Sequence, residues 1–259
     1  MSTFIHETAI VHPDAQIGVG CYIGPFCTVG GEVSLGSSVR LDSHVVVDGR
    51  TSIGDETHVF PFVSIGLGPQ DLKYAGEPTE TVIGKRNVIR EFVTIHRGTI
   101  GGGGITRIGD GNLLMAQAHV AHDCQVGNEI IMANAATLAG HVEIADRASV
   151  GAYSGVHQFC RVGREAFIGG YSVVVKDAPP FAIVQGNHAK CYGLNKVGAK
   201  RRGYSRETID KLNHAFHLLL SSKLNTTQAV ERIESEITDC PEVALLVDFI
   251  ASSKRGVIK

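Results

Sequence analysis

Aliphatic residues recur at every sixth position over the first two thirds of the chain, and this period constrains the fold more than any other feature. The series begins at Ile5 and, apart from two interruptions, continues to Val174. A period of six matches neither a helix nor an amphipathic strand, but it is the repeat of a parallel β-helix, in which about 18 residues form one triangular coil. Because stacked strands lie about 4.8 Å apart, about ten coils would give a rod of roughly 48 Å.

Two interruptions of the repeat predict loops that leave the prism, near 66–82 and 96–107. The first keeps the phase but places Asp71 and Glu77 at core positions, and the second is longer than two repeats and contains four consecutive glycines. A glycine-rich run can cradle phosphate, but here no Lys-Ser or Lys-Thr pair and no helix follow it. We therefore interpret this run as a flexible turn.

Beyond the repeat, the sequence pattern becomes helical. Ser205 fits an N-cap, Asn225 and Gln228 form a capping-box pattern, and Pro241 fits the first turn of a helix. The three helices that these residues predict cover 206–222, 225–237 and 241–256. We therefore expect a mainly β chain, with a parallel β-helix domain over 1–190 and a C-terminal α-helical domain over 191–259 that covers the open end of the rod.

Composition and charge exclude several classes of protein. Lys and Arg number 24 against 26 Asp and Glu, which argues against a nucleic-acid-binding protein, since such domains usually carry a basic excess. No apolar run approaches the ~18 residues of a transmembrane segment, and the first residues lack the regions of a signal peptide. The 6 cysteines form no CxxC pair and fit reduced thiols. We therefore expect a cytoplasmic protein.

Four of the 12 histidines lie close together in the second half of the repeat. A step of one coil places His122 beside Gly140 and next to His141, and it places His157 one residue short of Gly140. Together with His119, these side chains are expected along one edge of successive coils, where they meet the exposed N–H of Gly140. Such an edge indicates a functional site rather than scattered surface histidines.

Two kinds of chemistry could use this edge. A zinc-dependent hydratase would bind one metal ion through His119, His122 and His141, since neutral imidazoles are zinc ligands. An acyltransferase would use one histidine as a general base and the Gly140 N–H as a donor to the oxyanion. Asp123 follows His122 and could set its tautomer, although adjacent residues on a strand point apart. The residues favour acyl transfer and leave the metal site open.

Eight segments spread over the whole chain resemble the acyl-carrier-protein-dependent UDP-N-acetylglucosamine O-acyltransferases, which open lipid A biosynthesis in Gram-negative bacteria. These motifs are far more specific than the hexapeptide repeat, which many acyltransferases share. The segments are QDLKYAGEPT (70–79), TIHRGT (94–99), NLLM (112–115), AHVAHDCQVGN (118–128), TLAGHV (137–142), HQFC (157–160), QGNHA (185–189) and KRRG (200–203).

The resemblance implies a left-handed β-helix and a homotrimer with active sites between subunits. It implies transfer of a long-chain (R)-3-hydroxyacyl group from acyl carrier protein to the 3-hydroxyl of UDP-N-acetylglucosamine, without a metal or cofactor. His122 matches the catalytic base, Asp123 a residue that assists it, and Gly140 the oxyanion donor. Ten further residues match positions that bind the substrate: Gln70, Asp71, Lys73, His119, His141, His157, Gln158, Asn195, Arg201 and Arg202.

The resemblance leaves three points open. Val197 stands where an acidic residue near the ribose is expected. Gly170 matches the position that measures acyl length, where glycine would leave the groove open to a long tail; alternatively, it only relieves a crowded corner. The acceptor could also be the 3-amino analogue of the sugar. The basic run at 200–202 fits anion contacts to a nucleotide diphosphate or to an acidic carrier protein.

Overall fold

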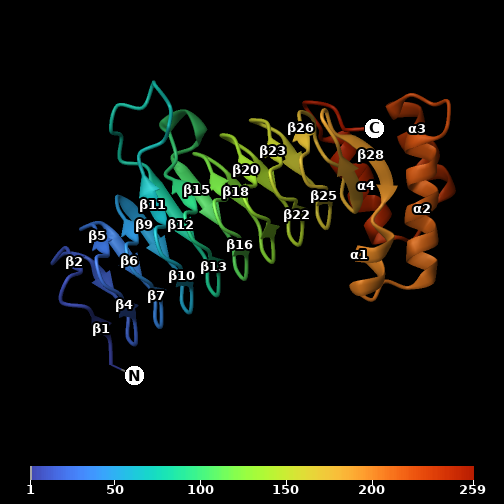
Figure 1. Ribbon diagram of the computed structural model, residues 1–259. Coiled ribbons are helices and arrows are strands. Elements are labelled where there is room, and N and C mark those ends of the chain that lie inside the picture. Colours follow the sequence, from blue (N-terminus) through green and yellow to red (C-terminus); the bar gives the residue numbers. More distant parts are fainter. Residues whose placement is uncertain (1) are drawn as a thin grey trace.

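The computed structural model describes residues 2–259 as a long rod of short strands that ends in a group of helices (Figure 1). From β1 to β26 the strand order of each of the three sheets advances by three along the chain, so consecutive strands of the rod belong to different sheets and three strands make one coil. Each strand of the rod pairs in parallel with the strands one coil before and after it. The fold is the predicted left-handed parallel β-helix with a C-terminal helical region.

The strands are short, and most contain two residues. The first sheet contains β1 (Phe4–Ile5), β4 (Tyr22–Ile23), β7 (Arg40–Leu41), β10 (His58–Val59), β13 (Val88–Ile89), β16 (Leu113–Leu114), β19 (Ile131–Met132), β22 (Ser149–Val150), β25 (Phe167–Ile168), β27 (Ala182–Gln185) and β28 (Lys190–Leu194). The second contains β2 (Ile10–Val11), β5 (Thr28–Val29), β8 (Val46–Val47), β11 (Ser64–Leu67), β14 (Thr94–His96), β17 (His119–Val120), β20 (Thr137–Leu138), β23 (Gly155–Val156) and β26 (Val173–Val174). The third contains β3 (Gln16–Ile17), β6 (Val33–Leu35), β9 (Arg50–Ile53), β12 (Glu80–Ile83), β15 (Ile105–Ile108), β18 (Gln125–Val126), β21 (Glu143–Ile144) and β24 (Arg161–Val162).

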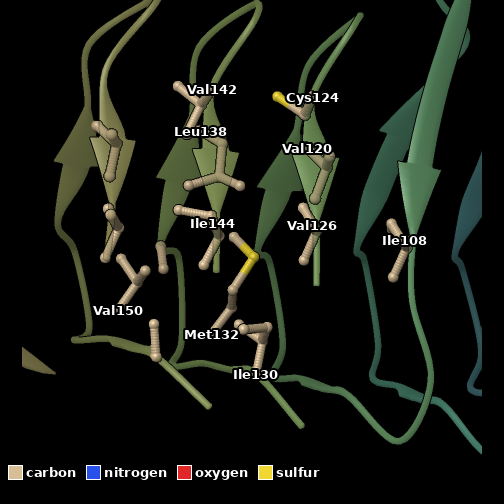
Figure 2. Packing of buried hydrophobic residues seen from close by; sticks show 14 of the residues in the cluster. Ile108, Val120, Cys124, Val126, Ile130, Met132, Leu138, Val142, Ile144 and Val150 are labelled. Carbon is tan, nitrogen blue, oxygen red and sulfur yellow. The ribbon is translucent and has the colours of Figure 1, made fainter. Parts of the chain in front are cut away.

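The core is a column of apolar side chains inside the prism. In most coils the aliphatic residue of the repeat lies on the strand, and a second buried residue lies two positions earlier, as Leu138 and Ala136 do. Figure 2 shows Leu138 beside Val120 of the preceding coil. Cys124 occupies one of the second positions, where burial raises the pKa of its thiol to about 12. The first coil departs from this pattern: Ile5 is 46% exposed, because no coil lies before it.

The corners use left-handed backbone at many residues other than glycine. Phe62 (φ 64°), Phe92 (φ 61°) and Asp123 (φ 61°) are examples. A non-glycine residue in this region costs on the order of 1–3 kcal/mol and persists where its surroundings fix it. Here the neighbouring coils supply that support, since the rings of Phe62 and Phe92 stack at 5.1 Å. Large side chains therefore occupy many of the corners and project from the edges of the rod.

The helical region contains the three predicted helices and one further helix. Ser205 accepts a hydrogen bond from the Thr208 N–H, and Asn225 and Gln228 form the complete capping box. The last helix ends at Ala251, earlier than predicted. The helices are α1 (Lys196–Arg201), α2 (Arg206–Leu220), α3 (Thr226–Glu236) and α4 (Pro241–Ala251).

Two elements near the end of the rod were not predicted. Strand β27 extends the first sheet by one more parallel strand, and β28 returns antiparallel to it. Helix α1 follows β28 directly.

A buried network attaches the helical region to the rod: Arg161 donates to Asp177 at 2.9 Å and to the Phe249 carbonyl at 2.9 Å. Over the described residues, no helix is both long and apolar enough to cross a membrane.

Candidate active site

The corner between β17 and β18 holds the central pair of the site. The Nδ1 atom of His122 lies 2.7 Å from Oδ2 of Asp123, and their side chains are 16% and 0% exposed. The expectation that these adjacent residues would point apart is wrong, because they lie at a corner and not on a strand. The left-handed backbone of Asp123 turns its side chain back toward the imidazole.

Asp123 is fixed by donors from a loop far away in the sequence. Thr99 donates its backbone N–H to Oδ1 at 2.8 Å and its hydroxyl to Oδ2 at 2.6 Å. The backbone N–H of Asp123 donates to the Thr106 hydroxyl at 2.8 Å. Both threonines belong to the second interruption of the repeat. An ionised carboxylate only accepts hydrogen bonds, so Oδ2 accepts both from the Thr99 hydroxyl and from Nδ1 of His122, which then carries the proton.

Gly140 lies one coil beyond His122, as the repeat predicted. A β-carbon at Gly140 would lie 2.5 Å from Cε1 of His122, so only glycine leaves room for the imidazole. The backbone N–H of Gly140 has no hydrogen-bond acceptor within residues 2–259. The His141 ring lies edge-on to His122 at 5.1 Å, and its Nε2 is 3.7 Å from Oδ2 of Asp123. This corner therefore combines an oriented imidazole with a free backbone donor.

The other predicted histidines take different positions. Nδ1 of His119 lies 2.6 Å from the Thr94 hydroxyl, and burial lowers the His119 pKa. His157 and Gln158 are exposed at the next corner along the rod, where His157 lies 3.4 Å from Arg255. The expected contact between His157 and the other imidazoles is not formed. The ring that stacks on His141, at 4.4 Å, belongs instead to Phe159, which stands one full coil away.

The first loop approaches the site from the side of His141. It joins β11 to β12 and is shorter than predicted, since these strands extend over the ends of 66–82 (Figure 1). Asp71 accepts the backbone N–H of Lys73 at 3.0 Å, and its charge acts against the lowering of the His141 pKa that burial causes. Gln70 and Lys73 are exposed. Lys73 has no carboxylate within ion-pair distance in the part of the chain that the structure describes.

The remaining predicted residues line a separate cavity of about 920 Å³ between the first sheet and α1. Asn195 caps α1 by accepting the Gly198 N–H, and Val197 and Arg201 lie on the same helix. None of the four predicted histidines lines this cavity, so a single chain does not bring the two groups together. The predicted residues in its lining are Gly170, Asn195, Arg201 and Arg202.

Three side chains of the histidine corner could hold a metal ion. Ligand atoms of His122, Asp123 and His141 lie within 4.8 Å of one another, and this is the one such group within residues 2–259. The zinc set expected from the sequence included His119 in place of Asp123, and the structure does not bring that set together. An ion here would compete with the Thr99 hydroxyl and the His122 N–H for Oδ2 of Asp123.

His96 is a buried histidine that sequence reasoning missed. Its ring lies 5.0 Å from that of His119, and its Nδ1 has no hydrogen-bond partner among residues 2–259. Burial, together with the nearby His119 and His122, lowers its pKa from 6.5 to about 4.

Stability is expected to fall as the pH is lowered from about 6.5 to about 4. Over this range the unfolded chain protonates His96 while the folded chain does not, so protons favour unfolding, by an amount on the order of 3 kcal/mol. Urea unfolding at several pH values measures this slope, and His96→Leu should flatten it. Equal slopes for the two proteins would contradict the assignment.

Comparisons with known proteins agree with the motifs over the whole chain. Residues 177–258 match a family model described as UDP N-acetylglucosamine O-acyltransferase, domain 2. The structure of LpxA from Acinetobacter baumannii is 45% identical, covers 98% of this chain and 99% of that chain, and has a TM-score of 0.96. UDP-N-acetylglucosamine O-acyltransferase (LpxA) from Moraxella catarrhalis is 44% identical with the same coverage and a TM-score of 0.95. The UDP-N-acetylglucosamine acyltransferase from Arabidopsis is 34% identical, covers 99% of this chain and 100% of that chain, and has a TM-score of 0.87. This chain belongs to the UDP-N-acetylglucosamine O-acyltransferase family.

Proposed function

We propose that this protein transfers a long-chain (R)-3-hydroxyacyl group from acyl carrier protein to the 3-hydroxyl of UDP-N-acetylglucosamine, the first step of lipid A biosynthesis. Membership of the family supports the reaction class. The observation that carries the mechanism is the corner at which His122 is held by Asp123 and lies against the backbone of Gly140. No cofactor takes part, and acyl carrier protein is a co-substrate.

His122 is the general base of this mechanism. Nδ1 of His122 keeps its proton and donates a hydrogen bond to Asp123. The lone pair on Nε2 then accepts the proton of the sugar hydroxyl as the hydroxyl oxygen attacks the thioester carbon. The carbonyl π electrons move to the oxygen of the tetrahedral intermediate, which the Gly140 N–H stabilises. Collapse of the intermediate expels the carrier-protein thiolate, which takes the proton from His122. The products are the acylated sugar nucleotide and the free carrier thiol.

The nucleotide sugar is proposed to span the two groups of predicted residues. His119 and His141 belong to the histidine edge, and Asp71 is near enough to act on the pKa of His141, whereas Asn195 and Arg201 line the separate cavity. One chain keeps these groups apart, and a neighbouring copy can place its cavity against the histidine corner. We therefore propose a homotrimer with sites between subunits. Tests of this assembly are the mass in solution and the activity of mixed oligomers of His122→Ala and Arg201→Ala chains.

The basic side chains near α1 suit anionic partners. Arg202 lies 3.4 Å from Glu129 and Arg201 is exposed, so the guanidinium of Arg201 is available to a diphosphate or to an acidic carrier protein. Val197, exposed at the rim of the same cavity, offers no hydrogen bond to a ribose hydroxyl. A carrier protein as acyl donor places the reaction in the cytoplasm.

Two measurements test the proposed reaction directly. The purified protein is assayed with UDP-N-acetylglucosamine and with its 3-amino analogue against carrier-protein thioesters of graded length. Acylation of the sugar hydroxyl supports the proposal. Acylation of the amino analogue alone would contradict the proposal that UDP-N-acetylglucosamine is the acceptor. Metal analysis and chelation address the hydratase alternative that His122, Asp123 and His141 keep open: stoichiometric zinc and loss of activity on chelation would favour it.

Replacing Lys73 by alanine is expected to raise the apparent KM for the nucleotide sugar without lowering the melting temperature. The side chain is exposed on a loop outside the prism and makes no ion pair with any residue that the structure describes, so it contributes little to folding. Lys223→Ala, a change of an exposed lysine between α2 and α3, is the matched control and should leave KM unchanged. A melting temperature lowered by many degrees with unchanged kinetics would show that Lys73 is structural.

A further inference from the structure

The carboxylate of Asp123 is enclosed in the protein, and its hydrogen bonds define one orientation. A buried carboxylate is costly unless donors satisfy it. The Thr99 N–H and hydroxyl contact different oxygens, at 2.8 and 2.6 Å, so together they fix the plane of the carboxylate. Oδ2 is then directed at Nδ1 of His122, at 2.7 Å. The same oxygen has a competing neighbour, since Nε2 of His141 lies 3.7 Å away.

The glycine-rich run that precedes β15 brings Thr99 to this carboxylate. Thr99 is the N-cap of a short 3-10 helix (Ile100–Gly102), but its side chain makes no capping hydrogen bond, which leaves the hydroxyl for Asp123. A β-carbon at Gly102 would lie 2.0 Å from Cγ of Asp123, so the backbone of this turn packs directly on the carboxylate. The run therefore has a specific role, in contrast to the flexible turn expected from the sequence.

We propose that Thr99 is a positioning residue for the acyl transfer, acting through Asp123, and that Gly102 permits this contact. The two hydrogen bonds from Thr99 direct Oδ2 of Asp123 to His122 rather than to His141. This orientation of the carboxylate fixes the tautomer in which Nε2 of His122 accepts the substrate proton. The inference rests on the proposed role of His122 as the base. Thr99 itself makes no contact with the reacting atoms.

The test compares Thr99→Val with Thr99→Ser in the carrier-protein assay. Valine keeps the branched shape but removes the hydroxyl, so kcat should fall about tenfold while both KM values stay unchanged. Serine keeps the donor and should remain within about twofold of wild type. Thr57→Val is the matched control: Thr57 is buried, its hydroxyl makes two hydrogen bonds to the backbone, and it lies two coils before the site, at a different corner of the prism. This control should lower stability and leave kcat unchanged.

A second variant, Gly102→Ala, disturbs the same carboxylate through the backbone of the turn that carries Thr99. Its methyl group would displace Asp123, so kcat should again fall with unchanged KM. If Thr99→Val does not fold, the kcat of Gly102→Ala provides the test instead. Wild-type kcat in Thr99→Val, equal kcat losses in Thr99→Val and Thr57→Val, or a serine variant as slow as the valine variant would each overturn the proposal. His122→Ala, assayed in parallel, separates the two ideas: full activity there refutes the base, whereas an inactive His122→Ala beside a normal Thr99→Val refutes only the role of Thr99.

Discussion

Replacing His122 by alanine is expected to lower kcat by 10²–10⁴-fold, the usual contribution of a general base. No other imidazole can substitute for it. His119 is engaged with Thr94, and His141 lacks the 2.7 Å contact with Asp123 that fixes the tautomer of His122. The measurement is the steady-state rate with saturating sugar nucleotide and acyl carrier protein, together with the thermal melting curve.

The control for this experiment is His122→Asn. The His122 side chain is only 16% exposed, so alanine removes one donor from the buried carboxylate of Asp123 as well as the base. The side-chain amide of asparagine can occupy the place of Nδ1 and restore that donor, but it has no basic nitrogen. We expect His122→Asn to be as inactive as alanine and closer to wild type in stability. If either variant kept activity within a few-fold of wild type, His122 would not be the base.

Replacing Gly170 by methionine is expected to shift the preferred acyl donor to chains several carbons shorter. Gly170 lines the 920 Å³ cavity beside α1. We propose that the part of this cavity next to Gly170 receives the end of the acyl tail, apart from the part next to Asn195 and Arg201 that we propose for the nucleotide. Each buried methylene contributes roughly 0.8 kcal/mol, about fourfold in binding, so a cavity open at this point favours long donors. Donors that are too long for the filled cavity would meet a packed wall. The measurement is kcat/KM over a series of carrier-protein thioesters.

The geometry around Gly170 permits this substitution better than that of its neighbours. A β-carbon at Gly170 would have its nearest contact at 3.3 Å, with the Ala152 carbonyl oxygen, so a small adjustment accommodates it. At Gly151 the corresponding contact is 2.5 Å to backbone, which no small movement relieves. Gly170→Ala serves as the graded control and should shift the preference little. An unchanged length profile in a folded Gly170→Met protein would show that the glycine only relieves a crowded corner.

The sequence predicted the rod well because its signal is periodic. The six-residue spacing identified both the coil and the neighbours of each position, so the placement of His122 against Gly140 followed from counting alone. The same counting could not find α1 or the antiparallel strand β28, since these short elements lie outside any repeat. It placed His157 one residue short of Gly140, and from there we expected it to reach the other imidazoles, but the ring that stacks on His141 belongs to Phe159.

The site was harder to predict wherever a contact crosses an interruption of the repeat. Thr99 and Asp123 are joined through a loop whose length breaks the phase, so no periodic argument relates them. The only sequence signal was that the spacing from Ile95 to Ile108 exceeds two repeats, together with the four glycines inside it. The sequence also did not show that the predicted residues divide between the histidine corner and the cavity beside α1. That division depends on which sheets meet at each corner of the prism.

The pairing of every strand with the strand one coil away also has a kinetic consequence. Pairs such as Leu138 with Val156 are separated by only 18 residues, about 0.07 of the length of a chain of 259. That fraction lies in the range of the relative contact orders of helical bundles and below the about 0.16–0.22 of β-sandwiches. Most added coils close a loop of 18 residues, and the coils that carry the two interruptions close one of 25 or 30, so the entropic cost of each step is modest and folding can nucleate in one coil and propagate along the axis. His122 and Gly140, one coil apart, come together in a single step of that propagation.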